Sequence, residues 1–272
     1  MPRRPLRHLT LPDPTARIYD QWLGEISERL DDPACDRYGL CRDVLFDLYY
    51  PGLSDYDGLV ADPATPRTTR AALLALDPHN VTLEPEHYHE IDPERYARVK
   101  PLLWLWQCFD RSPMGGGNVT VGVALRRILA RHVFHRCGQR FKCFQFVEFS
   151  FGYNIEVGDD VVVHRHVLLD DREPIVLGDR VSISDYANVY THSHDLVDPE
   201  EVSSTPVHLG DGVRITYHAT VLEGVDVGEH GMVGALGVAT KPVHPYHVHL
   251  GIPAVPKIVK PNAPDQEEGG RR

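Results

Sequence analysis

The sequence predicts a mainly β protein: a parallel β-helix preceded by an α-helical N-terminal region. Three observations lead to this prediction. Apolar residues recur at every sixth position between residues 153 and 260, five of them are followed directly by glycine, and small or β-branched residues recur four positions further on. A period of six fits neither a 3.6-residue helix nor two-residue alternation, so it indicates short strands joined by tight corners.

The repeat has twelve apolar markers, in a chain that is only 42% hydrophobic. Each marker is expected to point inward from one flat face of a prism, while the small residue fits the crowded corner. A coil of this kind buries its apolar side only by stacking on its neighbours. A β-sandwich would instead show a turn about every 8–12 residues. The markers are Val157, Val163, Leu169, Leu177, Ile183, Val189, Leu209, Ile215, Val221, Val227, Val233 and Ala239.

Composition restricts the class of partner and the compartment. The 272 residues carry a net charge of −11, which speaks against nucleic acid because phosphate binding needs clustered Lys and Arg. The five cysteines contain no CxxC pair and indicate a reducing compartment without a disulfide framework. No signal-peptide core and no apolar run of membrane-spanning length is present, so we expect a cytoplasmic protein without a membrane partner.

The N-terminal region, residues 1–136, is expected to be helical after a loose arm over residues 1–12. Asp13-Pro14 has the form of a helix cap followed by a first-turn proline. Further helices are expected at 36–50, around 73–76, from Asp92-Pro93 with a kink at Pro101, and at 121–136 with its arginines on a solvated face. Residues 51–66 are expected to be a connector, 137–260 the β-helix and 261–272 a disordered tail.

Aromatic residues cluster where the two regions meet. The closely spaced phenylalanines between Cys137 and Asn154 predict a first coil that caps the prism beneath the helices. Trp104 and Trp106 could form a shelf for a ligand, but at helical spacing they are expected to be core or interface residues. The glycine run at 115–117 lacks the Gly-Lys-Ser/Thr ending of a phosphate-binding loop and is expected to be a hinge.

An ordered set of motifs between residues 153 and 260 resembles a known family. They are Leu168-Leu169-Asp170-Asp171, Leu177-Gly178-Asp179, Asn188-Val189-Tyr190-Thr191-His192-Ser193-His194, Leu209-Gly210-Asp211-Gly212-Val213, Val233-Gly234-Ala235, Thr240-Lys241-Pro242 and Gly251-Ile252-Pro253-Ala254. The segment is similar to the left-handed β-helix acyltransferases built of hexapeptide repeats, in the branch of the maltose, galactoside and xenobiotic O-acetyltransferases. The similarity covers about two-fifths of the chain.

The resemblance implies an acyltransferase that uses coenzyme A or acetyl-CoA, without a metal, on a hydroxyl of a small-molecule acceptor such as a sugar or secondary metabolite. It also implies a homotrimer with each site in a cleft between neighbouring prisms. The family's catalytic histidine, four residues after the tyrosine of the Tyr-Thr pair, matches His194. Cofactor-binding positions match Gly234, Ala235, Thr240 and Lys241, and we add Arg214, Thr216, Tyr217 and Lys257 as further candidates.

Two stretches depart from the family pattern and leave the acceptor open. His164-Arg165-His166 stands where the sugar enzymes carry asparagines, and Arg214 and Tyr217 replace the usual Trp and Ser. The candidate acceptor-binding residues are Arg165, Asp170, Asp171, Asn188 and Tyr190. The acidic loop 192–206 favours a neutral or cationic acceptor over a phosphorylated one.

Histidine suits the role of general base because its ordinary pKa lies near the working pH. We expect His194 to be the base and His192 to orient the acceptor, with Asp195, Asp170 or Asp171 holding the second ring nitrogen. Cysteine is absent after Cys143, which favours direct transfer in a ternary complex over an acyl-cysteine intermediate. A backbone N–H at a coil corner could then meet the charge that develops on the thioester oxygen.

Two alternatives remain open. The same prism is used by zinc-dependent carbonic anhydrases, in which two ligand histidines sit five residues apart in one coil. The corresponding residues here are His218 and Glu223, so one ligand is missing. The other alternative is a non-catalytic trimeric scaffold, which the intact His-Ser-His loop and Thr-Lys pair disfavour.

Overall fold

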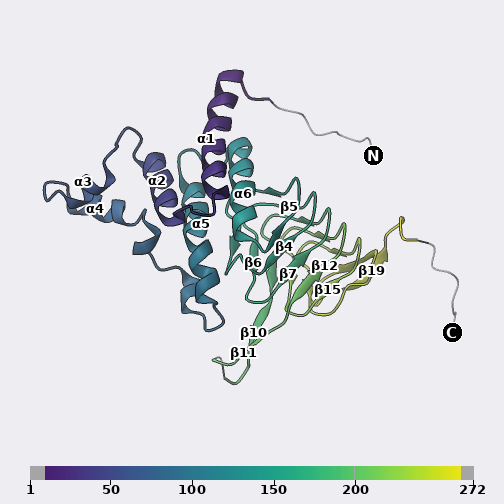
Figure 1. Ribbon diagram of the computed structural model, residues 1–272. Coiled ribbons are helices and arrows are strands. Elements are labelled where there is room, and N and C mark those ends of the chain that lie inside the picture. The colour runs from purple at the N-terminus through teal and green to yellow at the C-terminus, as the bar shows by residue number, and fades with distance from the viewer. Residues whose placement is uncertain (1–9, 199, 265–272) are drawn as a thin grey trace, which may run out of the picture. The chain divides into compact units, whose positions relative to one another are not determined.

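The computed structural model describes residues 10–198 and 200–264. The first nine residues of the expected arm and residues 265–272 of the expected tail therefore lie outside the described residues. The chain divides into two units, Met1–Asp36 and Arg37–Arg272, and each is described by itself (Figure 1).

The described part of the first unit contains one helix, α1 (Asp13–Asp31), with Pro14 in its first turn as the sequence predicts. The predicted cap at Asp13 was wrong, because Asp13 is the first residue of the helix, Pro12 precedes it, and no side chain caps the first turn. The last turn is followed by a local cap, in which Asp32 accepts a hydrogen bond from the Ala34 N–H at 2.9 Å.

The helices of the second unit largely follow the predicted positions. One prediction was wrong, because a short helix occupies residues 56–61 inside the expected connector. Its N-terminus is capped by Asp55, whose carboxylate accepts from the Gly58 N–H at 2.8 Å. The helices are α2 (Arg37–Tyr49), α3 (Tyr56–Ala61), α4 (Arg67–Leu74), α5 (Pro93–Arg111) and α6 (Val119–Val133), with 3₁₀ turns η1 (Pro78–Asn80) and η2 (Glu84–His87).

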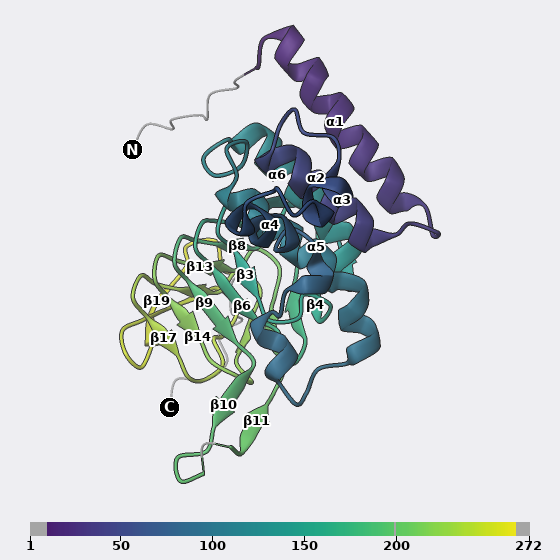
Figure 2. The ribbon, with the colours of Figure 1, turned by 90° about the vertical axis from the view of Figure 1, so that its left-hand side faces the viewer.

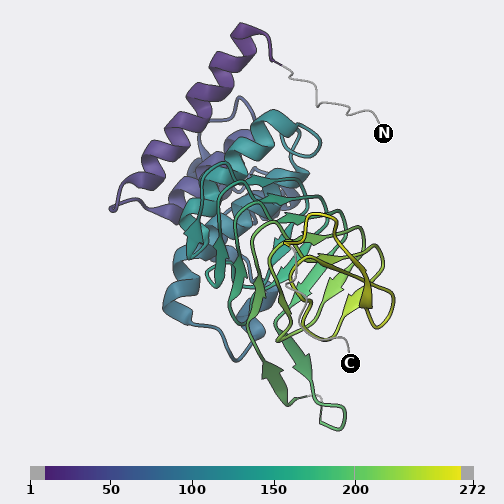
Figure 3. The same ribbon diagram turned by 90° about the vertical axis from the view of Figure 1, so that its right-hand side faces the viewer.

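From residue 136 the chain winds into a parallel β-solenoid, as Figures 1 and 3 show. Sheet A has the order β1-β4-β7-β12-β15, sheet B β19-β18-β16-β13-β8-β5-β2, and sheet C β17-β14-β9-β6-β3. The strands are β1 (Arg136–Cys137), β2 (Lys142–Cys143), β3 (Glu148–Phe149), β4 (Ile155–Val157), β5 (Val162–Val163), β6 (Leu168–Asp170), β7 (Ile175–Leu177), β8 (Ser182–Ile183), β9 (Asn188–Tyr190), β10 (His192–His194), β11 (Val202–Ser204), β12 (Val207–Leu209), β13 (Arg214–Ile215), β14 (Thr220–Val221), β15 (Asp226–Val227), β16 (Met232–Val233), β17 (Val238–Ala239), β18 (His247–Leu250) and β19 (Val255–Val259).

The six-residue markers form the interior of the solenoid. All twelve are at most 1% exposed, which confirms the inward direction that the repeat predicts. Equivalent residues of successive coils pair directly, as Cys137 does with Val157 and Val157 with Leu177. The next partner of Leu177 is Leu209, a longer step because the β10–β11 hairpin is inserted in that coil.

The corners of the coils place several residues in left-handed backbone conformation. Among residues 10–198 and 200–264, ten non-glycine residues adopt positive φ, and several recur at equivalent corners, including His166, Tyr186 and His218. Left-handed backbone is uncommon outside glycine. These three rings form a continuous outer stack, with centroid separations of 4.7 and 4.8 Å that match the spacing between strands.

The first coil is covered by helices and carries the expected aromatic cap. Trp106 of α5 meets Phe149 edge-on at 4.9 Å, and Phe141 and Phe151 are also buried. The prediction of a solvated arginine face on the last helix was wrong for Arg126, which is 1% exposed and pairs with Asp110 of α5. None of the helices in the described ranges has the length and apolar character that a membrane span requires.

Candidate active site on the outer face of sheet C

The histidine motif forms one strand of a hairpin that projects from the solenoid (Figures 1 and 2). β10 pairs antiparallel with β11, with Ser193 opposite Ser203. Since side chains alternate along a strand, His192 and His194 share one face and Ser193 occupies the other. The ring centroids of the two histidines are 5.3 Å apart.

A carboxylate fixes the opposite face of the hairpin. Glu223, in the turn after β14, accepts hydrogen bonds from the hydroxyls of Ser193 and Ser203, the latter at 3.0 Å. The two hydroxyls also contact each other at 3.1 Å. Both strands of the hairpin are therefore attached to the next coil.

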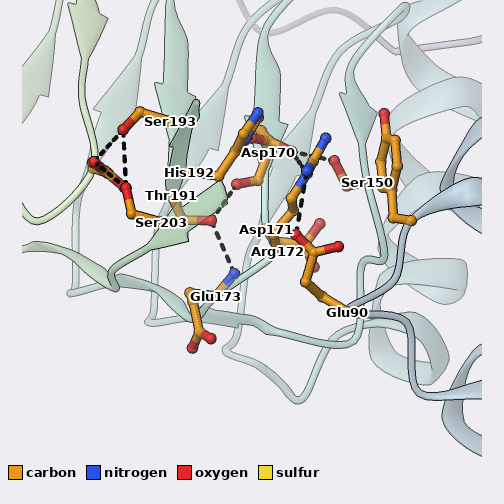
Figure 4. Close-up of polar contacts among 12 residues, drawn as sticks. Glu90, Ser150, Asp170, Asp171, Arg172, Glu173, Thr191, His192, Ser193 and Ser203 are labelled. Atoms are coloured by element: carbon orange, nitrogen blue, oxygen red, sulfur yellow. Dashed lines mark hydrogen bonds and ion pairs between the residues drawn. The ribbon is translucent and has the colours of Figure 1, made fainter. Parts of the chain in front are cut away.

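Asp170, at the end of β6, lies beside the base of the hairpin and is 4% exposed. One carboxylate oxygen contacts Nδ1 of His192 and the other accepts from the Ser150 hydroxyl (Figure 4). If Nδ1 carries the proton, the Nε2 atom of His192 is left with its lone pair. Of the three candidate acids, Asp170 is the one that holds a histidine ring among the described contacts.

A cavity of about 660 Å³ opens next to these residues, between the solenoid and the helical segment 82–107. His192, Asp170 and Tyr190 contribute to its solenoid wall, and Trp104 to its helical wall. Trp104 thus fits the ligand-shelf alternative by position, whereas Trp106 is a core residue with 1% exposure. The remaining lining residues are Thr82, Leu83, Glu84, Pro85, Tyr88, Tyr96, Leu103, Gln107, Glu148, Phe149, Ser150, Leu168 and Arg172.

Arg172 connects the two walls of the cavity. Its guanidinium lies over the Tyr88 ring at 3.9 Å, and it pairs with Glu90 at 3.3 Å and Asp170 at 3.9 Å (Figure 4). The Tyr88 hydroxyl donates to Glu84 at 2.7 Å, and burial together with this hydrogen bond raises the pKa of Tyr88 to about 12.

The other two candidate acids are used locally. Asp171 is fully buried and accepts from the N–H groups of Phe151 at 2.8 Å and Asn154 at 3.2 Å. Burial raises the pKa of Asp171 to about 7, and these backbone donors oppose the rise. Asp195 accepts from the Val197 and Asp198 N–H groups in the tip of the hairpin, which lowers the pKa of Asp195.

The remaining candidates lie along the two edges of sheet C. Arg165, Tyr217 and Ala235 occupy equivalent positions in successive coils, along the edge that sheet C shares with sheet B. The backbone N–H groups of Tyr186, His218 and Leu236 donate along this edge to the carbonyls of Arg165, Asp185 and Tyr217, respectively. Arg165 pairs there with Asp185 at 2.9 Å. On the opposite edge of sheet C, Asp170 pairs with Tyr190, and the Leu222 N–H donates to the Ala239 carbonyl. Thr240 and Lys241 therefore lie on the same edge as Asp170 and Tyr190.

The outer face of sheet C itself carries Asn188, which pairs with Leu168 and Thr220 in register. Four of the expected cofactor residues do not present a free side chain on the outer face of sheet C. Gly234 is buried, the Thr216 hydroxyl donates to the Val233 carbonyl at 2.8 Å, and Arg214 and Lys257 are exposed on sheet B.

Within the described ranges, no group of three or more His, Cys, Asp or Glu residues is arranged to hold a metal. His218 stacks on Tyr186, and Glu223 binds the hairpin serines, so each residue of the zinc comparison has another contact.

No protein-family model matches the chain. It is 27% identical to galactoside O-acetyltransferase of Escherichia coli over 165 residues, which cover 59% of this chain and 77% of that protein. It is 31% identical over 115 residues to a predicted acetyltransferase of Staphylococcus aureus, covering 41% of this chain and 57% of that protein.

Solved structures show the same fold. A maltose O-acetyltransferase from Clostridium difficile superimposes with a TM-score of 0.54 at 23% identity, covering 62% of this chain and 87% of that one. A hexapeptide-repeat acetyltransferase from Vibrio cholerae, complexed with acetyl-CoA, has a TM-score of 0.54 at 24% identity, covering 68% and 99%.

The solenoid is thus a left-handed β-helix of the hexapeptide-repeat type, which confirms the predicted fold. The chain is thus similar in sequence to galactoside O-acetyltransferase and has the fold of the hexapeptide-repeat acetyltransferases.

Apart from Trp104, the residues of the helical wall of the cavity were not predicted from the sequence, and neither was Ser150. Tyr88 and Tyr96 follow no motif. Arg172 had one available signal, because it directly follows the Asp170-Asp171 pair.

Proposed function

We propose that the protein is an acyl-CoA-dependent O-acyltransferase that transfers an acyl group, acetyl in the first instance, to a hydroxyl of a small molecule. The observation that carries this proposal is the order of features along the outer face of sheet C. The cavity lies against its first strands, the histidine hairpin leaves its middle, and Thr240 and Lys241 lie at its last strand. An acceptor and a thioester could therefore meet at the histidines.

In the proposed reaction His194 takes the proton of the acceptor hydroxyl. The hydroxyl oxygen attacks the thioester carbonyl carbon, the carbon–sulfur bond breaks, and the leaving thiolate of coenzyme A receives a proton. His194 is assigned by its position four residues after Tyr190, and its side chain is exposed on the same face as His192. His192, held by Asp170, is proposed to orient the acceptor.

The coenzyme is proposed to lie along the last coils of sheet C. Ala235 is small and exposed at one edge, which permits close approach of the pantetheine chain. Thr240 and Lys241 are exposed at the other edge and offer a hydroxyl and a point charge for the nucleotide phosphates.

We propose a homotrimer in which the hairpin of one copy contributes to a cleft with the next. The hairpin tip supports this, because Leu196 and Val197 are 100% and 92% exposed in the single chain. Sedimentation velocity at micromolar concentration should give the mass of three copies. A monomer under these conditions would remove the shared cleft.

The central experiment combines binding and turnover. Coenzyme A should bind the purified protein in isothermal titration calorimetry, and acetyl-CoA with a panel of hydroxyl acceptors should release free thiol that a disulfide reagent detects. Binding without release in any acceptor mixture would favour the scaffold alternative. Stoichiometric zinc that survives dialysis and requires His218 would favour the carbonic anhydrase-like alternative.

A further inference from the structure

Two polar atoms on the cavity wall are buried without a hydrogen-bond partner among the described residues: the Tyr96 hydroxyl and the Arg172 Nε. Tyr96 is 3% exposed and the Arg172 side chain 9%. Buried polar groups in proteins are almost always hydrogen-bonded, so an unpaired one calls for an explanation.

Packing does not explain the Tyr96 hydroxyl. The ring meets Phe151 edge-on at 6.3 Å, a contact that phenylalanine would make equally well. Neighbouring tyrosines use their hydroxyls, since Tyr88 donates to Glu84 and Tyr153 accepts from the Asp92 N–H at 2.9 Å. Burial raises the pKa of Tyr96, so its hydroxyl is neutral and able both to donate and to accept.

The charges around the cavity indicate which ligand these atoms would meet. Glu84, Glu148 and Asp170 are acidic members of the wall, against the single arginine Arg172. That arginine already pairs with Glu90 and Asp170 and lies over an aromatic ring. A phosphate or carboxylate entering the cavity would therefore meet uncompensated negative charge.

We propose that the cavity binds an uncharged acceptor through an oxygen atom that hydrogen-bonds with the Tyr96 hydroxyl and the Arg172 Nε–H, and that it excludes acceptors bearing a phosphate or carboxylate. The acceptor's apolar face packs against the aromatic walls contributed by Tyr88, Trp104 and Tyr190. This inference rests on the proposed function, because it identifies the acceptor of the same reaction. The specificity comes from the helical segment 82–107 as well as from the solenoid.

The test is equilibrium binding without coenzyme A, so that it does not depend on turnover. The probes are phenyl β-D-glucopyranoside, its galacto epimer and phenyl β-D-glucopyranoside 6-phosphate, measured by calorimetry. At least one uncharged glycoside should bind at millimolar concentration or better, and the 6-phosphate should bind at least tenfold more weakly than its parent.

Tyr96→Phe removes one oxygen atom and keeps the ring. If the hydroxyl serves a ligand, this variant should bind the glycoside about 2–10-fold more weakly, as the loss of one hydrogen bond implies. Its melting temperature should be unchanged or higher, because an unpaired buried hydroxyl is removed. Tyr49→Phe is the matched control. The Tyr49 hydroxyl donates to the Cys108 carbonyl at 2.7 Å, so this variant should melt lower and bind the glycoside unchanged.

Three results would overturn the assignment: no binding of either uncharged glycoside, equal or tighter binding of the 6-phosphate, or unchanged affinity in Tyr96→Phe. The proposed function fails separately, through the absence of coenzyme A binding by the wild-type protein. Coenzyme A binding without glycoside binding would therefore reject this cavity as the acceptor site and leave the acyltransferase proposal intact.

Discussion

The Asp170 carboxylate contacts the Nδ1 atom of His192 where the projecting hairpin leaves the solenoid. The same carboxylate accepts from Ser150, so its position is fixed by two neighbouring coils. This contact restrains the His192 ring and, through the shared β10 strand, the position from which His194 extends. The base of the hairpin is therefore held against the solenoid through His192.

The first prediction separates the roles of the two histidines. His194→Ala should lower kcat by roughly 10²–10⁴-fold, as expected for a general base, while coenzyme A binding and the melting temperature stay near wild type. His192→Ala should lose less turnover and raise KM for the acceptor. Steady-state kinetics with both substrates varied provide the measurement. If His192→Ala is inactive and His194→Ala retains most turnover, the base is His192, held by Asp170.

The second prediction concerns Glu223 as a positioning residue. Glu223→Ala removes the acceptor of both serine hydroxyls, so the hairpin should loosen and kcat should fall about 10-fold, with little change in coenzyme A binding. Glu223→Gln keeps an acceptor oxygen and should restore most of the loss. Glu229→Ala alters an exposed carboxylate of the next coil and serves as the control. An Ala variant as active as wild type would show that the hairpin needs no such anchor.

The third prediction concerns Lys241, which is exposed at the end of sheet C. Lys241→Ala should raise KM for acetyl-CoA more than it lowers kcat, because a point charge near the phosphates contributes to binding and not to the reacting bond. The effect should shrink as ionic strength rises. Lys257→Ala tests the second candidate lysine, which lies on β19 of sheet B and not at the end of sheet C. A lower kcat at constant KM would assign Lys241 to the chemistry or to folding.

The solenoid could be predicted from the sequence because its repeat is local. Val157, Leu177 and Leu209 each occupy the same position of a coil, so one periodicity determines their burial and their partners. The His-Ser-His motif could also be located, since it interrupts that periodicity.

The contacts of the site were harder to predict from the sequence, because they join segments far apart in the chain. Nothing near Asp110 indicates that it pairs with Arg126, and a helical pattern alone placed that arginine on a solvated face. Likewise, Arg172 and Glu90 are 82 residues apart, and Tyr88 joins them only once the helices cover the first coils. The helical wall of the cavity follows from tertiary packing and has no sequence motif.

The last prediction concerns the pH dependence of stability and rests on His249 of β18. This residue pairs in register with Val233, an inward-facing marker, and is 4% exposed at the end of the prism. Burial lowers the pKa of His249 below its ordinary value of 6.5, and the nearby His247 and His244 lower it further. In the unfolded chain His249 takes up a proton as the pH falls through 6.5, whereas in the folded chain it does so only at lower pH. The unfolded state then binds more protons, so the free energy of unfolding decreases as the pH falls below 6.5.

His249→Leu cannot take up this proton, so its free energy of unfolding in urea should decline less than that of wild type between pH 7.5 and 5.5. His208→Leu, at an exposed histidine that pairs with Asp226 at 2.9 Å, is the control and should not reduce the decline. Parallel curves for wild type and His249→Leu would show that His249 titrates alike in the folded and unfolded states.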